Sequence, residues 1–498
     1  VTYAFSSAAE ANDAMDHYEV IEVQGATPLS ANSNNSAVFG NVQTLTQDDI
    51  EGSVNRSLPE LLKTQLASVN LNDVQNNPFQ PDLQYRGFTA SSLLGLPQGI
   101  SVYLNGGRVN EAFGDTVHWD LMPLDAIDTV SLYSGSNPLF GQNTLGGALA
   151  LRTKTGFSFN ANEIDLQAGQ FGQKAASVES GGHNDHWAYY VNLNHYEEDG
   201  WRDYSPSEVQ QVFTSLAYKS DKMHLDMNLF MADNELLGNG ASPIELLDIE
   251  GREAVYTHPD QTNNELTHVN ITGDFVLTDT LSLTANMFYR DTQTQSINGD
   301  DSDFGACQFA DGRVTLCEFE DDDDNDDDDA PLDSDDDGDD DDLPVVGEGD
   351  DIEAVEFIGF DDDTALAEIS NVDADELDGT YNTGRTDAKA TGLSFQLAKQ
   401  YALSGFSSEL IVGASYTKGD VNYAADTTFG ILENESAQDS RTVLPIDGLM
   451  AQEARVRLDV DTTAWSLFFM NSTQLSSAVS LNLGGRFNRD HIVMEDLI

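Results

Sequence analysis

A strict alternation of apolar and polar residues recurs after Gly156 and constrains the fold of this chain more than any other feature. In KMHLDMNLFMAD (222–233) one face carries Met223, Leu225, Met227, Leu229 and Met231, and the other carries His224, Asp226, Asn228 and Phe230. Segments 281–290 and 480–489 alternate in the same way. A period of two predicts β-strands with one apolar and one polar face. Because the polar face includes Arg, Asn and Asp, these strands suit a barrel with a polar interior and an apolar exterior.

The links between the predicted strands alternate in length. We expect strands at 163–171, 174–182, 186–197, 209–219, 222–232, 264–277, 280–293, 387–401, 405–419, 452–473 and 479–491. The links after the even-numbered strands are short, namely GHND, KSDK, LTDT, ALSG and LSSA, whereas those after the odd-numbered strands are long, except for the first. Outer-membrane barrels have short periplasmic turns and longer outer loops. The pattern therefore predicts a transmembrane antiparallel β-barrel whose long links face the cell exterior.

One of these predicted outer loops, an insert at about 294–386, carries the run EDDDDNDDDDAPLDSDDDGDDDD (320–342). The chain has a formal net charge of −65, and no Lys or Arg lies between Arg313 and Arg385. This charge excludes a nucleic-acid partner, because phosphates would be repelled. In an outer loop the run can stay solvated, so no part of the fold has to bury it.

The acidic run contains one metal-binding pattern. Asp333, Asp335 and Asp337 precede Gly338 at the spacing of calcium-binding loops, in which carboxylate oxygens converge on the ion. Any alternating pattern also arises by chance in a tract of Asp, and Pro344 stands where the closing Glu belongs. A solvated, disordered tract and a Ca²⁺ site are therefore the two interpretations, and Ca²⁺ is the only cofactor that we consider.

The chain has two cysteines, Cys307 and Cys317, just before the acidic run. In an exported protein this proximity predicts a local disulfide, with two free thiols as the alternative. A zinc site does not fit, because the spacing is wrong and no His lies nearby.

Residues before Gly156 lack the strict alternation and show mixed helix and strand patterns, which are typical of a compact α/β unit. Leucines at helical spacing predict a helix at 57–66. The segment GISVYLNGGRV (99–109) predicts two strands joined by a turn, and 125–135 predicts a short helix that leads into a strand.

Three motifs in this unit resemble the plug domain of TonB-dependent outer-membrane receptors: LQYRGF (83–88), ISVYLNGGRV (100–109) and GSNPLFGQNTLGGALALRTKTG (135–156). The residues that carry the resemblance are Arg86, Gly87, Phe88, Asn137, Pro138, Phe140, Gly141, Gly146 and Gly147. It implies a plug at 37–156 and a partial barrel at 157–498, about half of a 22-stranded barrel. On this interpretation the chain is a fragment, and 1–16 is a signal-peptide remnant or an N-terminal tail.

The segment YEVIEVQG (18–25) resembles a TonB box, and we assign 17–36 to this box and a linker. The box residues would be Glu19, Val20, Ile21, Glu22 and Val23. Such a segment adds a strand to the sheet edge of a partner, which can then pull on it. The alternative is that the segment forms the first strand of the plug.

The resemblance implies energy-coupled uptake of a scarce nutrient, such as a siderophore-bound iron or a similar metal chelate, across the outer membrane. The partners would be TonB, outer-membrane lipid and the small-molecule ligand. The chain shows no nucleophile-elbow, zinc-protease or phosphate-loop motif, so we do not expect an enzyme. The rival hypotheses are a calcium-binding or adhesion protein that uses the barrel as an anchor, and a soluble β-rich enzyme.

Several single residues have two possible roles. Phe113, His118 and Trp119 lie in a segment expected at the outer mouth, where they would contact ligand or pack in the plug core. Arg86 is expected to pair with buried acids or carbonyls and hold plug against barrel, with ligand contact as the alternative. His183 and His186 are expected to be solvated in a periplasmic turn rather than to bind metal.

Overall fold

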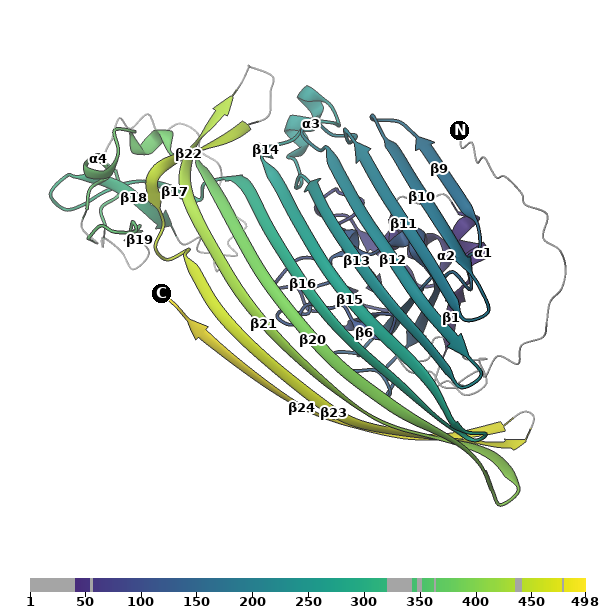
Figure 1. The fold of residues 1–498 in the computed structure, drawn as a ribbon. Helices are drawn as coiled ribbons and strands as arrows, with labels where there is room; N and C mark the ends of the chain where they lie inside the picture. Colours follow the sequence, from purple (N-terminus) through teal and green to yellow (C-terminus); the bar gives the residue numbers. More distant parts are fainter. Residues whose placement is uncertain are drawn as a thin grey trace.

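The computed structural model describes residues 41–53, 57–319, 343–346, 352–361, 364–434, 441–476 and 479–498. A small domain lies against one face of a long, tilted antiparallel sheet (Figure 1). The predicted TonB box, the N-terminal tail and the candidate calcium ligands Asp333, Asp335 and Asp337 lie outside the described residues.

The small domain, which we call the plug, contains two sheets and two helices. Its elements are β1 (Val42–Leu45), α1 (Gln47–Glu51), α2 (Leu58–Gln65), β2 (Val69–Asn72), β3 (Asp82–Tyr85), β4 (Phe88–Ala90), β5 (Ile100–Leu104), β6 (Gly107–Arg108), η1 (Trp119–Leu121), η2 (Leu124–Ala126), β7 (Ile127–Ser134) and β8 (Gly147–Thr153). One sheet has the order β1-β7-β8-β5-β6 and the other β2-β3-β4. Leu58, Leu61 and Leu62 of α2 are buried in the plug core, as the helical spacing predicts.

The long sheet has thirteen strands, and every strand predicted from the alternation is present. Its strands are β9 (Asn162–Ala168), β10 (Lys174–His183), β11 (Trp187–Glu198), β12 (Ser207–Ser220), β13 (Met223–Leu237), β14 (Thr257–His258), β15 (Asp260–Thr278), β16 (Leu281–Asp301), β20 (Gly379–Leu403), β21 (Phe406–Asn434), β22 (Arg441–Met450), β23 (Val456–Ser476) and β24 (Val479–Asp496). Pairing is antiparallel throughout, apart from the short β14–β22 contact. A short helix, α3 (Ile244–Glu250), lies in the link between β13 and β15.

Several strands extend beyond their predicted bounds at the end where the long links lie. β16 continues to Asp301, β20 begins at Gly379, and β21 continues to Asn434, where β22 pairs with it. The sequence there, for example TQTQS at 292–296, is polar on both faces. The alternation reports a difference between two environments, so it stops where both faces are polar, although the strand continues.

Burial across the long sheet is the reverse of that in a soluble protein. On the face away from the plug, Leu393 and Leu483 are 51% and 65% exposed. On the plug side, Asn264 and Gln396 are fully buried. The apolar face of the alternation therefore points outward and the polar face packs around the plug. Among the described residues, no helix is long and apolar enough to cross a membrane.

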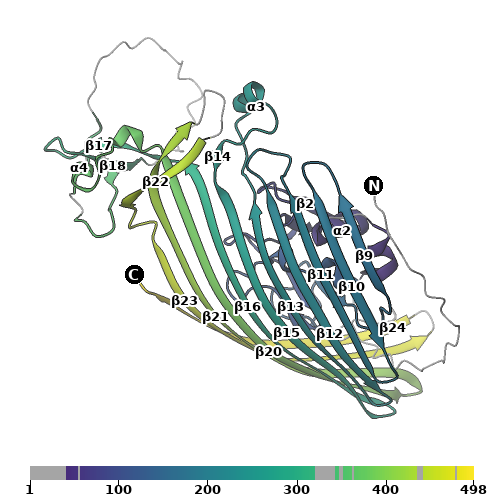
Figure 2. The same cartoon turned by 45° about the horizontal axis from the view of Figure 1, so that its top comes forward.

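The acidic insert at about 294–386 is not simply a solvated loop. Its described residues form a small folded unit, the outer lobe, with β17 (Phe304–Gln308), β18 (Val314–Phe319), β19 (Ile352–Ala354), α4 (Leu366–Ile369) and η3 (Ala374–Glu376) (Figure 2). Leu316, Val355 and Phe357 pack with Phe429 and Leu449 from the extended ends of β21 and β22. Cys307 and Cys317 form a disulfide with an Sγ–Sγ distance of 2.09 Å. The sequence did not predict this core, because acidic residues dominate the composition of the insert and only a few apolar residues form the core.

Candidate functional site: the contacts between plug and sheet

The YRGF motif forms a tight turn between β3 and β4. Arg86 and Gly87 both have positive φ, at 52° and 84°, as in the two-residue turns that suit a β-hairpin. The Arg86 side chain is exposed, with its guanidinium carbon 5.2 Å from the centre of the Tyr85 ring. None of the ion pairs among the described residues involves Arg86. The turn directs the Arg86 side chain outward in the described part of the chain, and its expected pairing with buried acids or carbonyls stays a prediction.

The glycines at the end of the last motif make room for neighbouring groups. A Cβ atom on Gly146 would lie 2.5 Å from the Phe88 side chain, and one on Gly147 would lie 2.5 Å from the Tyr133 carbonyl oxygen. Gly146 therefore allows Phe88 of the first motif to pack against the last, and Gly147 allows close pairing of β7 with β8.

The rest of the last motif organises a buried loop beside the long sheet. The Asn137 Oδ1 atom accepts a hydrogen bond from the Leu139 amide at 3.0 Å, and Pro138 is half-buried between them. The buried Phe140 ring packs against Tyr133, with ring centres 4.7 Å apart. The Gly141 amide donates to the Tyr103 hydroxyl at 2.7 Å. The motif thus packs the plug core, and its Leu139 carbonyl accepts a hydrogen bond from Arg486 of β24 at 3.4 Å.

The three residues proposed for ligand contact lie in different surroundings. Trp119 is 1% exposed in the plug core, and its indole N–H donates to the Ala90 carbonyl at 3.3 Å. His118 is also buried. Phe113 is half-buried against Ala388, Val421 and Val460 of β20, β21 and β23. Of the two roles left open, the structure describes the core role for Trp119, and ligand contact by Phe113 and His118 stays a prediction.

Asp120, which the sequence patterns did not single out, is the centre of the contact between plug and sheet. Its carboxylate Oδ2 accepts hydrogen bonds from Asn234 of β13 at 2.9 Å and from Asn264 of β15 at 3.0 Å. Its backbone carbonyl accepts from Gln211 of β12 at 2.6 Å. Asp120 is 1% exposed, and burial raises the pKa of its carboxyl group. One plug residue thus connects three neighbouring strands.

Further polar contacts join plug and sheet. The Glu111 carboxylate accepts from Arg290 Nε at 3.3 Å and from the Thr292 hydroxyl at 3.2 Å. The Asn105 carbonyl accepts from the Thr272 hydroxyl at 3.0 Å and the Asn286 amide at 2.9 Å. No sequence signal marked these residues, because contact between segments so far apart depends on the tertiary fold.

Lys154, at the end of β8, connects the plug to the first strands of the sheet. Its ammonium group lies 3.1 Å from Glu179 of β10 and 3.2 Å from Glu51 of α1. Burial lowers the pKa of Lys154, but attraction to Glu179 and Glu51 outweighs this effect and leaves the pKa above its ordinary value. The protonated Lys154 therefore contributes stability that is lost as the pH rises past that raised pKa.

These contacts are hydrogen bonds and ion pairs between buried polar groups. Water can replace such partners when the two surfaces separate, so separation has a smaller free-energy cost than exposure of an equal apolar area. The plug is therefore positioned by these polar contacts together with apolar packing, in which Phe79, Leu121 and Leu139 of the plug meet side chains of the sheet.

Asp125, in η2, provides a pH-dependent test of this packing. Burial is the main cause of its raised pKa, and the nearby Asp165 adds to it, against the opposing effects of Ser177 and Lys154. A carboxyl group whose pKa is raised by folding lowers stability above its unfolded pKa, and this cost is absent below it. Asp125→Asn should therefore raise the urea midpoint of the plug at pH 8, and the gain should disappear below the ordinary pKa of 3.8. An equal gain at both pH values would contradict the assignment.

The sheet also positions the two histidines that were expected to be solvated. His183 and His186 are exposed at the turn between β10 and β11, where His186 Nδ1 lies 3.1 Å from the Lys219 carbonyl oxygen. Within the described part of the chain, no group of three or more His, Cys, Asp or Glu side chains could hold a metal ion.

Comparison with known proteins agrees with this architecture. Residues 34–148 match the family model of the TonB-dependent receptor plug domain. The vitamin B12 transporter BtuB of Vibrio cholerae serotype O1 is 25% identical over 147 residues, which are 29% of this chain and 23% of that protein.

Solved structures share the fold at low sequence identity. The open form of the ferric-catecholate import receptor Fiu from E. coli K12 superposes with a TM-score of 0.63 at 12% identity, over 95% of this chain and 63% of that one. The siderophore receptor PiuA from Acinetobacter baumannii gives a TM-score of 0.63 at 13% identity, over 95% and 61%. This chain thus spans less than two thirds of the length of these relatives. Residues 34–148 are thus a plug domain of the TonB-dependent receptor kind, and the chain shares its overall fold with solved outer-membrane receptors.

Proposed function

We propose that this chain belongs to an outer-membrane active transporter that binds a scarce nutrient, such as a siderophore-bound iron or a similar chelate, and imports it into the periplasm. The observation that carries the proposal is a plug held by polar contacts on the inner face of a sheet whose outer face is apolar. TonB would supply the energy by pulling on the segment at residues 19–23, and no covalent chemistry is required. A protein that uses its barrel only as an anchor needs no such plug.

The relatives support a small nutrient as the ligand. The names of the similar proteins include a ferric-catecholate import receptor, a siderophore receptor and a vitamin B12 transporter. The outer lobe and the long links lie at the same end of the sheet, which we place outside the cell.

Placement of the apolar face in lipid makes a direct prediction. Leu483 points outward from β24 and is 65% exposed, whereas the next residue toward the N-terminus, Asn482, points to the inner face and accepts a hydrogen bond from Ser472. Leu483→Arg should destabilise the full-length protein in lipid vesicles by up to about 2–4 kcal/mol, because the cation would enter the hydrocarbon region. Asn482→Arg is the matched control and should have a smaller effect, and the measurement is the urea midpoint. Equal effects would contradict the lipid-facing assignment.

Transport itself can be tested by disruption of the complete gene. Cells without the gene should lose uptake of one of three labelled probes, namely a ferric catecholate, ferric citrate or cobalamin, and a plasmid copy should restore it. Undiminished uptake of all three probes and unchanged growth under iron limitation would contradict the proposal. Release of the protein from membranes by mild salt would favour the soluble-enzyme alternative.

A further inference from the structure

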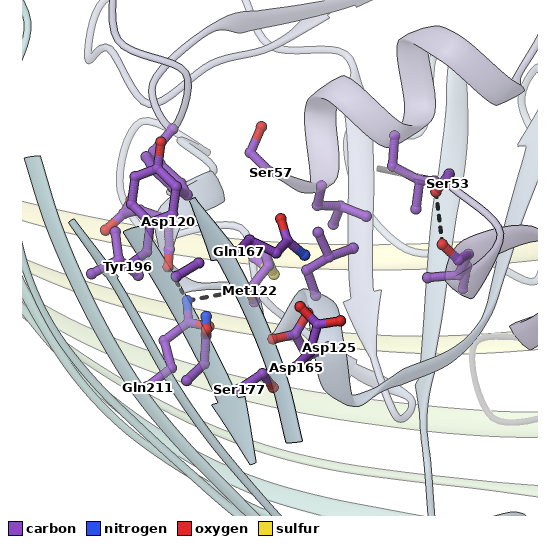
Figure 3. A pocket seen from close by; sticks show the side chains of 18 of the residues that line it. Ser53, Ser57, Asp120, Met122, Asp125, Asp165, Gln167, Ser177, Tyr196 and Gln211 are labelled. Carbon is purple, nitrogen blue, oxygen red and sulfur yellow. Dashed lines mark hydrogen bonds between the residues drawn. The ribbon is translucent and has the colours of Figure 1, made fainter. Parts of the chain in front are cut away.

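A cavity of about 330 Å³ lies between the plug and strands β9–β12 (Figure 3). The plug contributes residues of α1, α2 and the segment 119–125, and the strands contribute inward-facing residues such as Asp165, Ser177 and Gln211. Its volume falls in the range of small-molecule sites. Some lining residues, such as Asp120 and Lys154, take part in the contacts between plug and sheet. Those contacts do not account for the other polar residues that face the cavity.

The lining of the cavity is strongly acidic. It contains the carboxyl groups of Glu51, Asp120, Asp125, Glu163, Asp165 and Glu179. Lys154 is the only Lys or Arg among the lining residues, and its ammonium group is already paired with Glu179 and Glu51. Asp125 and Asp165 approach each other from plug and sheet, and the close-up shows them side by side. Two carboxylates placed this close repel each other, and a bound cation would relieve that repulsion.

Two buried polar atoms on the cavity wall point to an occupant. Asp120 Oδ1 and the Ser57 hydroxyl have no hydrogen-bond partner among the described residues, although the two residues are only 1% and 3% exposed. Buried polar atoms are nearly always hydrogen-bonded in folded proteins. When Asp120 is ionised its carboxylate can only accept, so a hydrogen-bond donor in the cavity would both satisfy Oδ1 and stabilise the charge. An ammonium group is both a donor and a cation, and it therefore matches the wall in charge and in hydrogen bonding.

We propose that this cavity is a subsite for an ammonium-type cation, and that the cargo carries such groups. This inference rests on the proposed transport function. The outer lobe carries the same sign of charge, because Glu353, Asp375 and Glu376 are exposed on it and would attract the same class of molecule. Because the lobe surface and the cavity wall are both negatively charged, they favour a positively charged cargo.

The potential in the cavity can be measured with charged thiol reagents on the purified full-length protein. The two cysteines of this chain are joined in a disulfide, so neither of them offers a free thiol to the reagents. Ser177→Cys places that thiol on the cavity wall. The trimethylammonium-bearing methanethiosulfonate should react faster there than the sulfonate-bearing one, by about tenfold or more relative to the same ratio for free cysteine. Asp125→Asn combined with Asp165→Asn should remove most of this preference.

A second cavity in the same molecule provides a matched control. Ser394 of β20 lies on a smaller cavity whose lining includes Arg108, Arg486 and Asp490. Ser394→Cys should therefore show no preference for the cationic reagent. If Ser177→Cys does not fold, Gln167→Cys on the same acidic wall replaces it.

Occupancy can be tested with spermidine as the probe. Spermidine should slow the reaction of neutral iodoacetamide with Ser177→Cys and leave Ser394→Cys unaffected. A cation preference no greater than that of free cysteine, failure of every reagent to reach the cavity, or equal protection at both positions would overturn the proposal. These measurements require neither TonB nor uptake, so the cation subsite and the transport function can fail separately.

Discussion

Deletion of residues 19–23 from the full-length protein should abolish energy-dependent uptake and leave the receptor on the cell surface. Residues 18–25, YEVIEVQG, are rich in β-branched residues and precede the polar linker ATPLSANSNNSA. An extended segment of this kind can pair with the sheet edge of TonB and transmit a pulling force to the plug. Without it, ligand would bind at the outer face and remain there. Uptake and surface binding of the same labelled probe, measured in parallel, should separate these two steps.

Single substitutions can distinguish pairing from a simple effect of length. Ile21→Pro removes one backbone donor and blocks strand pairing, so it should reproduce the loss of uptake. Ser30→Pro, in the linker, is the control and should transport normally. If Ile21→Pro transports normally, or if the deletion removes the protein from the surface, the assignment of this segment as a TonB box is wrong.

Asp120→Ala should weaken the contact between plug and sheet more than substitution of any single partner on the strands. It removes the carboxylate that accepts from Asn234 and Asn264, and it leaves both amide groups buried without that partner. Each buried amide donor left without an acceptor costs about 1–3 kcal/mol, so the free energy of unfolding of the plug should fall by roughly 3 kcal/mol. The measurement is the urea midpoint of the plug, followed by fluorescence of the buried Trp119.

Asp115→Ala is the matched control for this experiment. Asp115 forms a half-buried ion pair with Arg108 at 2.7 Å within the plug and makes no described ion pair with the sheet. Asp115 also accepts a hydrogen bond from the Asn143 amide at 2.6 Å, again within the plug, so its loss should cost about 1–3 kcal/mol and leave the contacts with the sheet intact. Cells that carry Asp120→Ala should also become sensitive to vancomycin, because a loosened plug lets large solutes pass. Equal midpoints for the two variants, with no change in sensitivity, would show that Asp120 does not hold the plug in place.

The local patterns of the sequence were sufficient to predict the main architecture. The alternation at Met223–Met231 specified which residues face outward, because a strand has a side-chain period of two and each face meets one environment. The leucines of α2 and the hairpin turn after β5 followed from spacing and turn chemistry in the same way. The plug motifs were recognisable because Gly146 and Gly147 tolerate no side chain in this packing.

The tertiary structure alone decided which polar residues meet. Asp120 is separated from Asn264 by 144 positions, and no local pattern relates the two residues. The same holds for Glu111 and Arg290, for the acidic cavity, and for the outer lobe, whose core draws Phe429 and Leu449 from distant strands. Periodicity records the environment of each residue along its own strand, whereas the identity of a partner depends on how separate segments pack together.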